Sequence, residues 1–161
     1  MEPLLTDRLD LVEVTEPDIP AVRDLFREYQ RWLGVDLCFQ GFEQELAALP
    51  GCYAPPWGAI FLAVAKPEPV GCVAIRPRTS DEAELKRLYL RPAYWGGGMG
   101  KRLFRAAMSR AECIGYRSMV LDTLPSMSAA KALYMSHGFQ EIPPYYHNPE
   151  PGAEFYRYHF K

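Results

Sequence analysis

A glycine-rich stretch, RPAYWGGGMGKRLF at residues 91–104, holds the residue types best suited to chemistry in this chain. Four glycines fall within five positions, and Lys101 and Arg102 follow directly. Glycines cost ordering entropy on folding, and they let the backbone approach a ligand closely. We expect a strand before this loop and a helix after it, so the first amides and the dipole of that helix would face an anion. The stretch therefore predicts a phosphate-binding loop, and a pyrophosphate fits it best.

Two common phosphate-binding loops do not match this stretch. A P-loop needs G-x-x-x-x-G-K-[ST], which would require glycine in place of Trp95 and serine or threonine in place of Arg102. The dinucleotide fingerprint G-x-G-x-x-G, begun at Gly96, would require glycine in place of Lys101, and it belongs after an early strand. A plain strand-to-helix turn with basic residues beside it is the structural alternative.

The elements that must hold this loop follow from the periodicity of the apolar residues. Strands are predicted at 9–14, 59–65, 70–77, 84–90, 118–123, 139–142 and 154–160, and helices from 17 to 34 and at 41–49, 99–114 and 126–137. Gly115 is the expected C-terminal cap of the third helix, and Ser126 is the expected N-cap of the fourth. The order β-α-α-β-β-β-α-β-α-β-β indicates an α/β fold in which helices cover both faces of a mixed sheet.

The strand before the glycine loop, at 84–90, breaks the alternation expected of a regular strand. Leu85 and Leu88 are an odd number of residues apart, whereas Leu88 and Leu90 keep a period of two. A β-bulge near Lys86-Arg87 would bring all three leucines to one face. Because bulges often lie beside functional sites, this strand is expected to border the site.

Composition bounds the class of protein. The 161 residues suit one domain over 1–161, and 48% hydrophobic residues suit an ordinary core. A net charge of −2 argues against general nucleic-acid binding. The four cysteines form no C-x-x-C pair, so no metal site is predicted, and Cys72 and Cys113 are expected in the core. With no signal peptide and no membrane-spanning apolar run, we expect a cytoplasmic protein that does not contact a membrane.

Two segments together resemble the GNAT N-acetyltransferase superfamily. The family loop P-x-x-[RQ]-G-x-G-x-[GA] corresponds to PAYWGGGMG at 92–100, and the family helix N-x-x-A-x-x-L-Y-x-x-x-G-F corresponds to MSAAKALYMSHGF at 127–139. Trp95 stands where the family has Arg or Gln, and Met127 stands where it has Asn. The resemblance implies a mixed, mostly antiparallel sheet of about seven strands flanked by about four helices.

The resemblance also implies acetyl-CoA as the cofactor. In such enzymes the bulged strand pairs with the pantetheine arm, the glycine loop holds the pyrophosphate, and a strand amide polarises the thioester carbonyl that an amine attacks directly. The cofactor-binding residues implied in this sequence are Leu88, Tyr89, Leu90, Trp95, Gly96, Gly97, Gly98, Met99, Gly100, Lys101, Arg102 and Met127.

Two residues take catalytic roles by the same resemblance. Tyr134 would be the general acid that protonates the leaving CoA thiolate, since a phenol remains protonated near pH 7. Glu84 would be the general base that accepts the proton of the amine. His147, Tyr146 or a water relay are the alternatives to Glu84. The structural alternatives are a packing tyrosine and a solvated glutamate.

Aromatic residues are the expected walls of the acceptor site. Rings can hold an alkyl or cationic amine, and the same rings can be purely structural. The predicted substrate-binding residues are Tyr29, Trp32, Tyr145, Tyr146 and His147, with Tyr53 as a further wall residue.

The expected function is acetyl-CoA-dependent transfer of an acetyl group to the primary amine of a small or amino-acid-like acceptor. Loss of the usual polar residues at Trp95 and Met127 favours one alternative, a catalytically inactive acyl-CoA-binding or sensing domain. Acetylation of a protein N-terminus or lysine is the other alternative. The acceptor, the acyl chain length and the formation of a homodimer are left open by the sequence.

Overall fold

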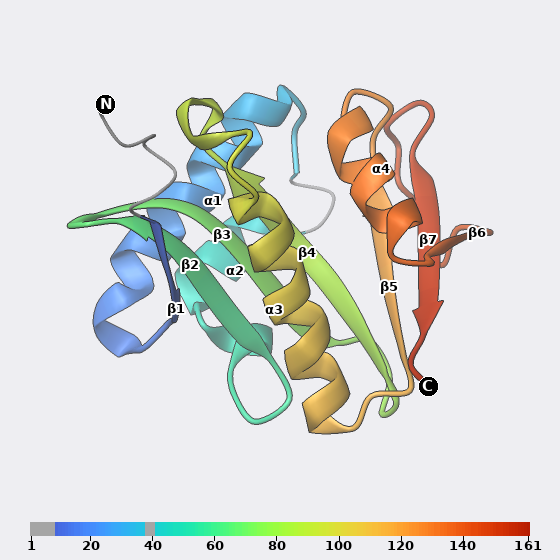
Figure 1. The fold of residues 1–161 in the computed structure, drawn as a ribbon. Helices are drawn as coiled ribbons and strands as arrows, with labels where there is room; N and C mark the ends of the chain where they lie inside the picture. Colours follow the sequence, from blue (N-terminus) through green and yellow to red (C-terminus); the bar gives the residue numbers. More distant parts are fainter. Residues whose placement is uncertain (1–8, 38–40) are drawn as a thin grey trace.

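The computed structural model describes residues 9–37 and 41–161. Its sheet follows the order β1-β2-β3-β4-β5-β7-β6 (Figure 1). The strands are β1 (Leu9–Glu13), β2 (Ala59–Ala65), β3 (Glu68–Pro77), β4 (Glu82–Leu90), β5 (Ser118–Thr123), β6 (Gln140–Ile142) and β7 (Glu154–His159). The helices are α1 (Ile19–Leu33), α2 (Phe42–Ala48), α3 (Met99–Ile114) and α4 (Ser128–Ser136).

The predicted order of elements and the mixed α/β fold are confirmed. All neighbouring strands pair antiparallel except β4 and β5, which pair parallel. Gly34 and Gly115 end α1 and α3 in the left-handed conformation, with φ of 71° and 108°, which a residue with a Cβ adopts only at a cost. The N-cap predicted at Ser126 is wrong: α4 begins at Ser128 with Met127 as N-cap and no capping side chain.

Helices cover both faces of the sheet, and each face has its own core (Figure 1). On one face α3 buries the predicted stripe of Leu103, Ala107 and Ala111 against the sheet, together with residues of α4. On the other face α1 and α2 pack over β2 and β3, and Cys72 lies in that core as predicted. The core position predicted for Cys113 is wrong, because its side chain lies on the outer side of α3 and is exposed.

The predicted bulge is present in β4. Cys72 faces Tyr89 and Ala74 faces Lys86, so Arg87 and Leu88 together stand against one residue of β3. Arg87 takes the extra turn with φ 59°, a conformation that costs a non-glycine residue free energy. Its carbonyl accepts the Cys72 thiol at 3.2 Å. The bulge places leucines 85, 88 and 90 against the core on the α3 face, as the spacing predicted.

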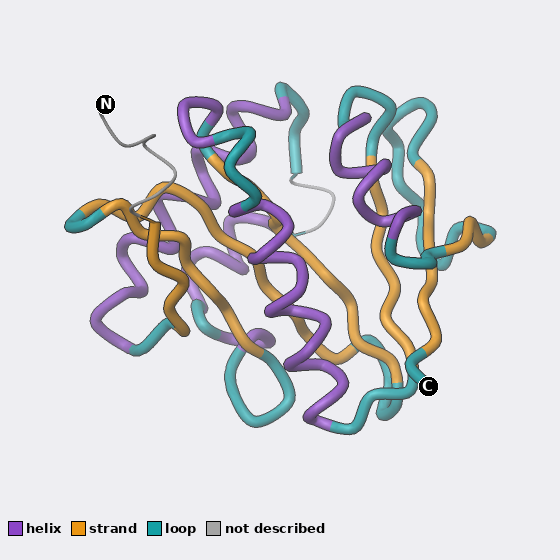
Figure 2. Tube along the Cα trace, in the orientation of Figure 1, coloured by secondary structure: helices purple, strands orange, loops and turns teal. Residues whose placement is uncertain are grey.

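Strands β4 and β5 are paired over only part of their length. Their ladder joins Glu82–Glu84 to Ser118–Val120, and beyond it the two strands diverge (Figure 1). We call the laddered part the closed end and the diverging part the open end. At the closed end the Glu82 carboxylate accepts Ser118 Oγ at 2.6 Å and Arg157 Nε at 2.8 Å. Both the loop before α3 and the start of α4 lie at the open end (Figure 2).

Among residues 9–37 and 41–161, no helix is both long enough and apolar enough to cross a bilayer.

Candidate active site

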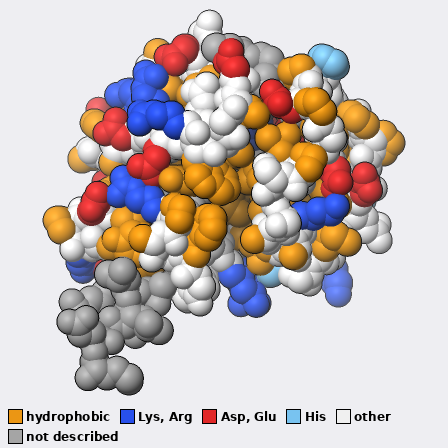
Figure 3. Space-filling view, turned by 90° about the horizontal axis from the view of Figure 1, so that it is seen from above, with side chains coloured by type: hydrophobic (Ala, Val, Ile, Leu, Met, Phe, Trp, Pro, Cys, Tyr) orange, Lys and Arg blue, Asp and Glu red, His pale blue; other side chains and the backbone are white. Residues whose placement is uncertain are grey.

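Two adjoining cavities occupy the open end between β4 and β5. The large cavity has a volume of about 500 Å³ and the small cavity about 40 Å³. Leu88 and Met127 line both, so the two spaces meet at the bulge. Figure 3 looks onto this end and shows hydrophobic side chains gathered around a hollow. The strand that was predicted to border a site therefore does border these cavities.

The glycine loop and the start of α3 form one end of the large cavity. Gly96 and Gly98 have φ of 90° and 84°, and Gly98 is the N-cap of α3 without a capping side chain. A Cβ built at Gly96, Gly98 or Gly100 would meet nothing within 4 Å, so the backbone here borders open space. The first amides of a helix lack internal partners and carry partial positive charge. This end of the cavity can therefore hold an anion such as a pyrophosphate.

Most of the predicted cofactor-binding residues line the large cavity. Those that line it are Leu88, Tyr89, Leu90, Trp95, Gly96, Gly98, Met99, Gly100, Lys101 and Met127. Gly97 and Arg102 are not among the lining residues, and the Arg102 guanidinium donates to the Leu9 carbonyl at 3.4 Å. Trp32 of α1, which was predicted as a substrate-binding residue, also lines the large cavity. Sequence reasoning missed the lining residues near the start of α4 and along it, which are Ser126, Ser128, Ala129, Ala130 and Leu133.

Trp95 bonds to the strand next to it. Its indole Nε1 donates to the Leu90 carbonyl at 2.8 Å, and its ring meets Trp32 edge to face at 6.1 Å. Just over half of its side chain is exposed, at 55%. Trp95 thus forms an aromatic side of the large cavity, and its indole takes up a hydrogen bond of the Leu90 carbonyl.

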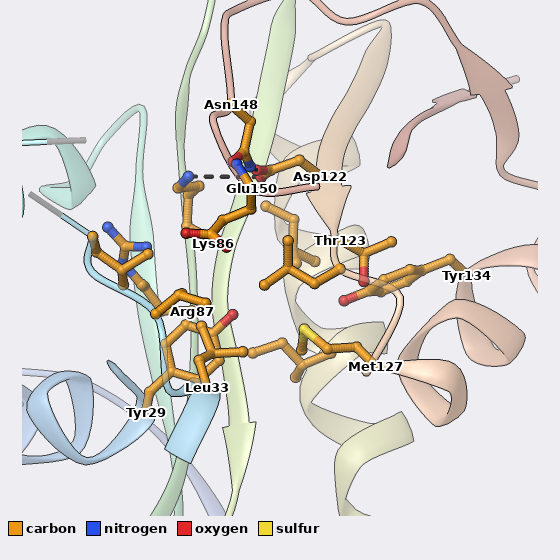
Figure 4. A pocket seen from close by; sticks show the side chains of 15 residues that line it. Tyr29, Leu33, Lys86, Arg87, Asp122, Thr123, Met127, Tyr134, Asn148 and Glu150 are labelled. Carbon is orange, nitrogen blue, oxygen red and sulfur yellow. Dashed lines mark hydrogen bonds and ion pairs between the residues drawn. The ribbon is translucent and has the colours of Figure 1, made fainter. Parts of the chain in front are cut away.

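The small cavity combines an apolar wall with charged and polar groups. Leu33, Val35 and Leu37 line one side, from the end of α1 and the segment after it. The polar lining, shown in Figure 4, comprises Tyr29, Lys86, Arg87, Asp122, Thr123, Tyr134, Asn148 and Glu150. Lys86 is buried beside the Asp122 carboxylate, with 3.8 Å between Nζ and Oδ1. Burial lowers the pKa of Lys86, and the nearby Asp122 carboxylate opposes that shift.

Tyr134 projects from α4 into the small cavity. Its ring packs against Phe104 at 5.4 Å and Phe139 at 6.0 Å between centroids, which fixes its direction. Its hydroxyl points toward the space between α4 and β4 (Figure 4). Burial raises the pKa of this hydroxyl well above its ordinary range, so Tyr134 keeps its proton near neutral pH.

Glu84 lies at the closed end, away from both cavities. The residue is 4% exposed, and its carboxylate accepts Arg76 Nε at 2.8 Å and the Tyr145 hydroxyl at 2.6 Å. It is not among the residues that line either cavity. The role of Glu84 as a general base stays a prediction, and these contacts give it a structural task in joining β3, β4 and the segment before β7.

The residues predicted to form the walls of the acceptor site do not lie around one cavity. Tyr29 lines the small cavity, whereas Trp32 lines the large one. Tyr145 and Tyr146 meet the Phe155 ring edge to face, and their hydroxyls donate to Glu84 and Asp122. His147 is exposed and lies outside both linings. Tyr53, the further wall residue, is fully buried and donates to Glu45 at 2.9 Å.

Several polar residues of the small cavity were missed from the sequence. Asp122 accepts the Tyr146 hydroxyl and accepts Asn148 Nδ2 at 3.1 Å. Arg87 bonds twice to the Glu45 carboxylate, at 3.0 Å from Nε and 3.0 Å from a terminal nitrogen. A signal for one of these residues existed, since Asp122 is the one charged position of the strand SMVLDT. Within the described ranges, no cluster of His, Cys, Asp or Glu has the arrangement of a metal site.

Comparison with known proteins gives one consistent result. The model of the acetyltransferase (GNAT) family matches residues 19–139. An uncharacterized N-acetyltransferase of Schizosaccharomyces pombe is 40% identical over 144 residues, covering 87% of each chain. An uncharacterized N-acetyltransferase of Escherichia coli is 31% identical over 134 residues, covering 80% of each.

Solved structures agree on the fold. The PaiA N-acetyltransferase of Thermoplasma acidophilum in complex with coenzyme A has a TM-score of 0.73 at 18% identity, covering 94% of this chain and 99% of that one. A GNAT family acetyltransferase of Elizabethkingia anophelis with acetyl-CoA bound has a TM-score of 0.67 at 20% identity, covering 96% and 99%. At these identities the likeness concerns the fold.

Proposed function

The chain belongs to the GNAT acetyltransferase family, and from that premise we propose that it is an acetyl-CoA-dependent N-acetyltransferase acting on a primary amine of a small acceptor. One observation carries the proposal. A helix start suited to an anion lines a cavity of about 500 Å³, and that cavity meets a small cavity lined by Tyr134, whose burial keeps its hydroxyl protonated.

The residues of the large cavity suit acetyl-CoA. The open backbone at Gly96, Gly98 and Gly100 would take the pyrophosphate, and Lys101 adds a full positive charge. The backbone of β4 after the bulge, which lies beyond the ladder to β5, would pair with the pantetheine arm, except that Trp95 already bonds the Leu90 carbonyl. Acetyl-CoA supplies a thioester whose carbonyl an amine can attack.

The chain's own groups would serve the acetyl transfer at the junction of the two cavities. The bulge of β4 lies at the junction, and a backbone amide of this strand would polarise a carbonyl placed there, as the family resemblance implies. Tyr134 would hold its proton at the hydroxyl and donate it to the departing thiolate sulfur. The apolar lining of Leu88 and Met127 would keep water from the thioester.

The test is release of CoA from acetyl-CoA across a panel of primary amines, paired with calorimetric titration of CoA. We expect CoA to bind and at least one short amine to be acetylated. Binding of CoA without turnover of any amine would identify an acyl-CoA-binding domain instead. New acetyl groups on proteins of a treated proteome, with no small amine turned over, would identify a protein acetyltransferase.

A further inference from the structure

Four charged residues line the small cavity, and three of them have an oppositely charged partner in the protein. Arg87 is answered by Glu45, and both side chains are buried, at 3% and 8% exposed. Lys86 is answered by Asp122 across 3.8 Å. The fourth charged lining residue, Glu150, bonds through its carboxylate to no residue of 9–37 or 41–161. Because Asp122 and Glu45 already pair with the two cations, the Glu150 carboxylate is the charge of this lining that is left to meet a ligand.

Glu150 is held in a position to meet a ligand. Its backbone amide donates to Asn148 Oδ1 at 2.9 Å, which fixes the turn between β6 and β7. Its half-buried side chain extends from that turn toward β4 (Figure 4). A carboxylate with no protein partner, facing a cavity, is suited to an ammonium group, because a charge-assisted hydrogen bond is stronger than a neutral one.

A second group of the same cavity also lacks a partner. The Thr123 hydroxyl is buried and forms no hydrogen bond within the described chain, although its residue lines the small cavity. Buried polar groups are nearly always hydrogen-bonded, so an orphan hydroxyl here points to a missing donor or acceptor. A primary amine has more than one N–H, so it can donate to a carboxylate and also to a hydroxyl oxygen.

The size and the wall of the cavity limit the rest of the ligand. A volume of about 40 Å³ holds roughly three to four water-sized groups, which suits a short alkylamine. The aliphatic side chains of Leu33, Val35 and Leu37 favour an alkyl group over a polar one. A carboxylate beside the amine would instead meet Asp122 and Glu150, whereas the cations Lys86 and Arg87 are already paired with protein carboxylates.

We propose that Glu150 determines acceptor specificity by binding the ammonium group of a short alkyl monoamine, with Thr123 as its second contact. Acceptors with a carboxylate next to the amine are disfavoured by the same charge. This inference rests on the proposed function, because it takes the small cavity as the place of the acceptor.

The test compares propylamine with 2-aminobutyrate, which has the same alkyl chain and an added carboxylate. Wild-type kcat/KM should favour propylamine by at least about tenfold, the effect of a charged hydrogen bond. Glu150→Gln keeps the shape and removes the charge, so the KM for propylamine should rise about tenfold while the KM for acetyl-CoA stays the same. Thr123→Val should raise the KM for propylamine without lowering thermal stability, since the hydroxyl has no partner to lose.

The matched control is Glu141→Gln, an exposed glutamate of β6 outside both cavity linings, which should leave both KM values unchanged. A second readout is calorimetric titration of propylamine into the protein–CoA complex, which does not depend on turnover. Equal affinity of wild type and Glu150→Gln, or a wild-type preference for 2-aminobutyrate, would overturn the inference. Propylamine that binds through Glu150 and is never acetylated would overturn the proposed function alone.

Discussion

The two ends of β4 satisfy their charges in different ways. At the closed end Glu82 is bonded by Ser118 and Arg157, and Glu84 is bonded by Arg76 and Tyr145. At the open end the ladder to β5 has stopped, and Glu150 there lacks a protein partner within the described residues. The comparison teaches that one strand carries two tasks: polar groups stabilise the fold where the ladder is intact, and they are left for ligands where it ends.

The largest effect is expected at the open end, from Tyr134→Phe. The variant loses the proton donor for the thiolate, so kcat should fall about a hundredfold or more. The hydroxyl has no hydrogen bond to another described residue, so the free energy of unfolding should change little. The measurement is CoA release under saturating substrates, with urea denaturation beside it. Wild-type kcat in this variant would rule out the acid role.

At the closed end we expect a substitution to lower stability and to leave cofactor binding unchanged. Glu82→Gln removes the charge that Arg157 and Arg78 share, and we expect the free energy of unfolding to fall by about 2 kcal/mol. The KM for acetyl-CoA of the folded enzyme should not change, because Glu82 lies outside both cavities. Urea denaturation measures the loss, and Glu112→Gln, exposed on α3, is the control. A selective rise in KM would show that the two ends are not separate.

A pair of glycine variants on α3 sharpens the comparison further. Gly98→Ala and Gly115→Ala each force a Cβ into a left-handed conformation, at about 1 kcal/mol. Both positions are open within 4 Å, so stability should fall equally. Only Gly98 borders the large cavity, so only its variant should raise the KM for acetyl-CoA. An equal rise in KM for both would mean that helix stability, rather than the cradle, controls binding.

The smallest effect concerns pH. Burial alone would raise the pKa of the Glu82 carboxyl, but hydrogen bonds from Arg157 and Ser118 outweigh it, and the pKa lies below its ordinary value. A carboxyl whose pKa is lower in the folded state contributes stability above its unfolded pKa and loses it as pH falls through the folded pKa. Acidification below about pH 4 should therefore narrow the stability gap between wild type and Glu82→Gln. A gap that stays constant with pH would contradict this assignment.

Much of the fold was predictable because local rules agreed with the global arrangement. Helical and strand periodicities placed the elements, and the odd spacing of Leu85 and Leu88 located the bulge. The N-cap failed at Ser126 because α4 begins two residues later, with a local geometry that no side chain caps. Cys113 failed because an apolar stretch does not show which side of a helix its thiol faces.

The small cavity was less predictable than the large one. The glycine loop is contiguous in sequence, so most of its residues line the same cavity. Lys86, Asp122 and Glu150 come from β4, β5 and the segment before β7, and only the divergence of the strands brings them to one space. Glu84 and Tyr145 bond to each other at the closed end, so neither lines the small cavity. The pattern of a single strand does not reveal such a contact.

The contact between Trp32 and Trp95 gives the large cavity a built-in optical reporter. These two indoles meet at 6.1 Å and both line the large cavity, whereas Trp57, the third tryptophan, lines neither cavity and is exposed. A molecule entering the large cavity changes the surroundings of two of three emitting rings and leaves the third as a constant background. Occupancy can thus be followed by ultraviolet fluorescence in the unlabelled protein.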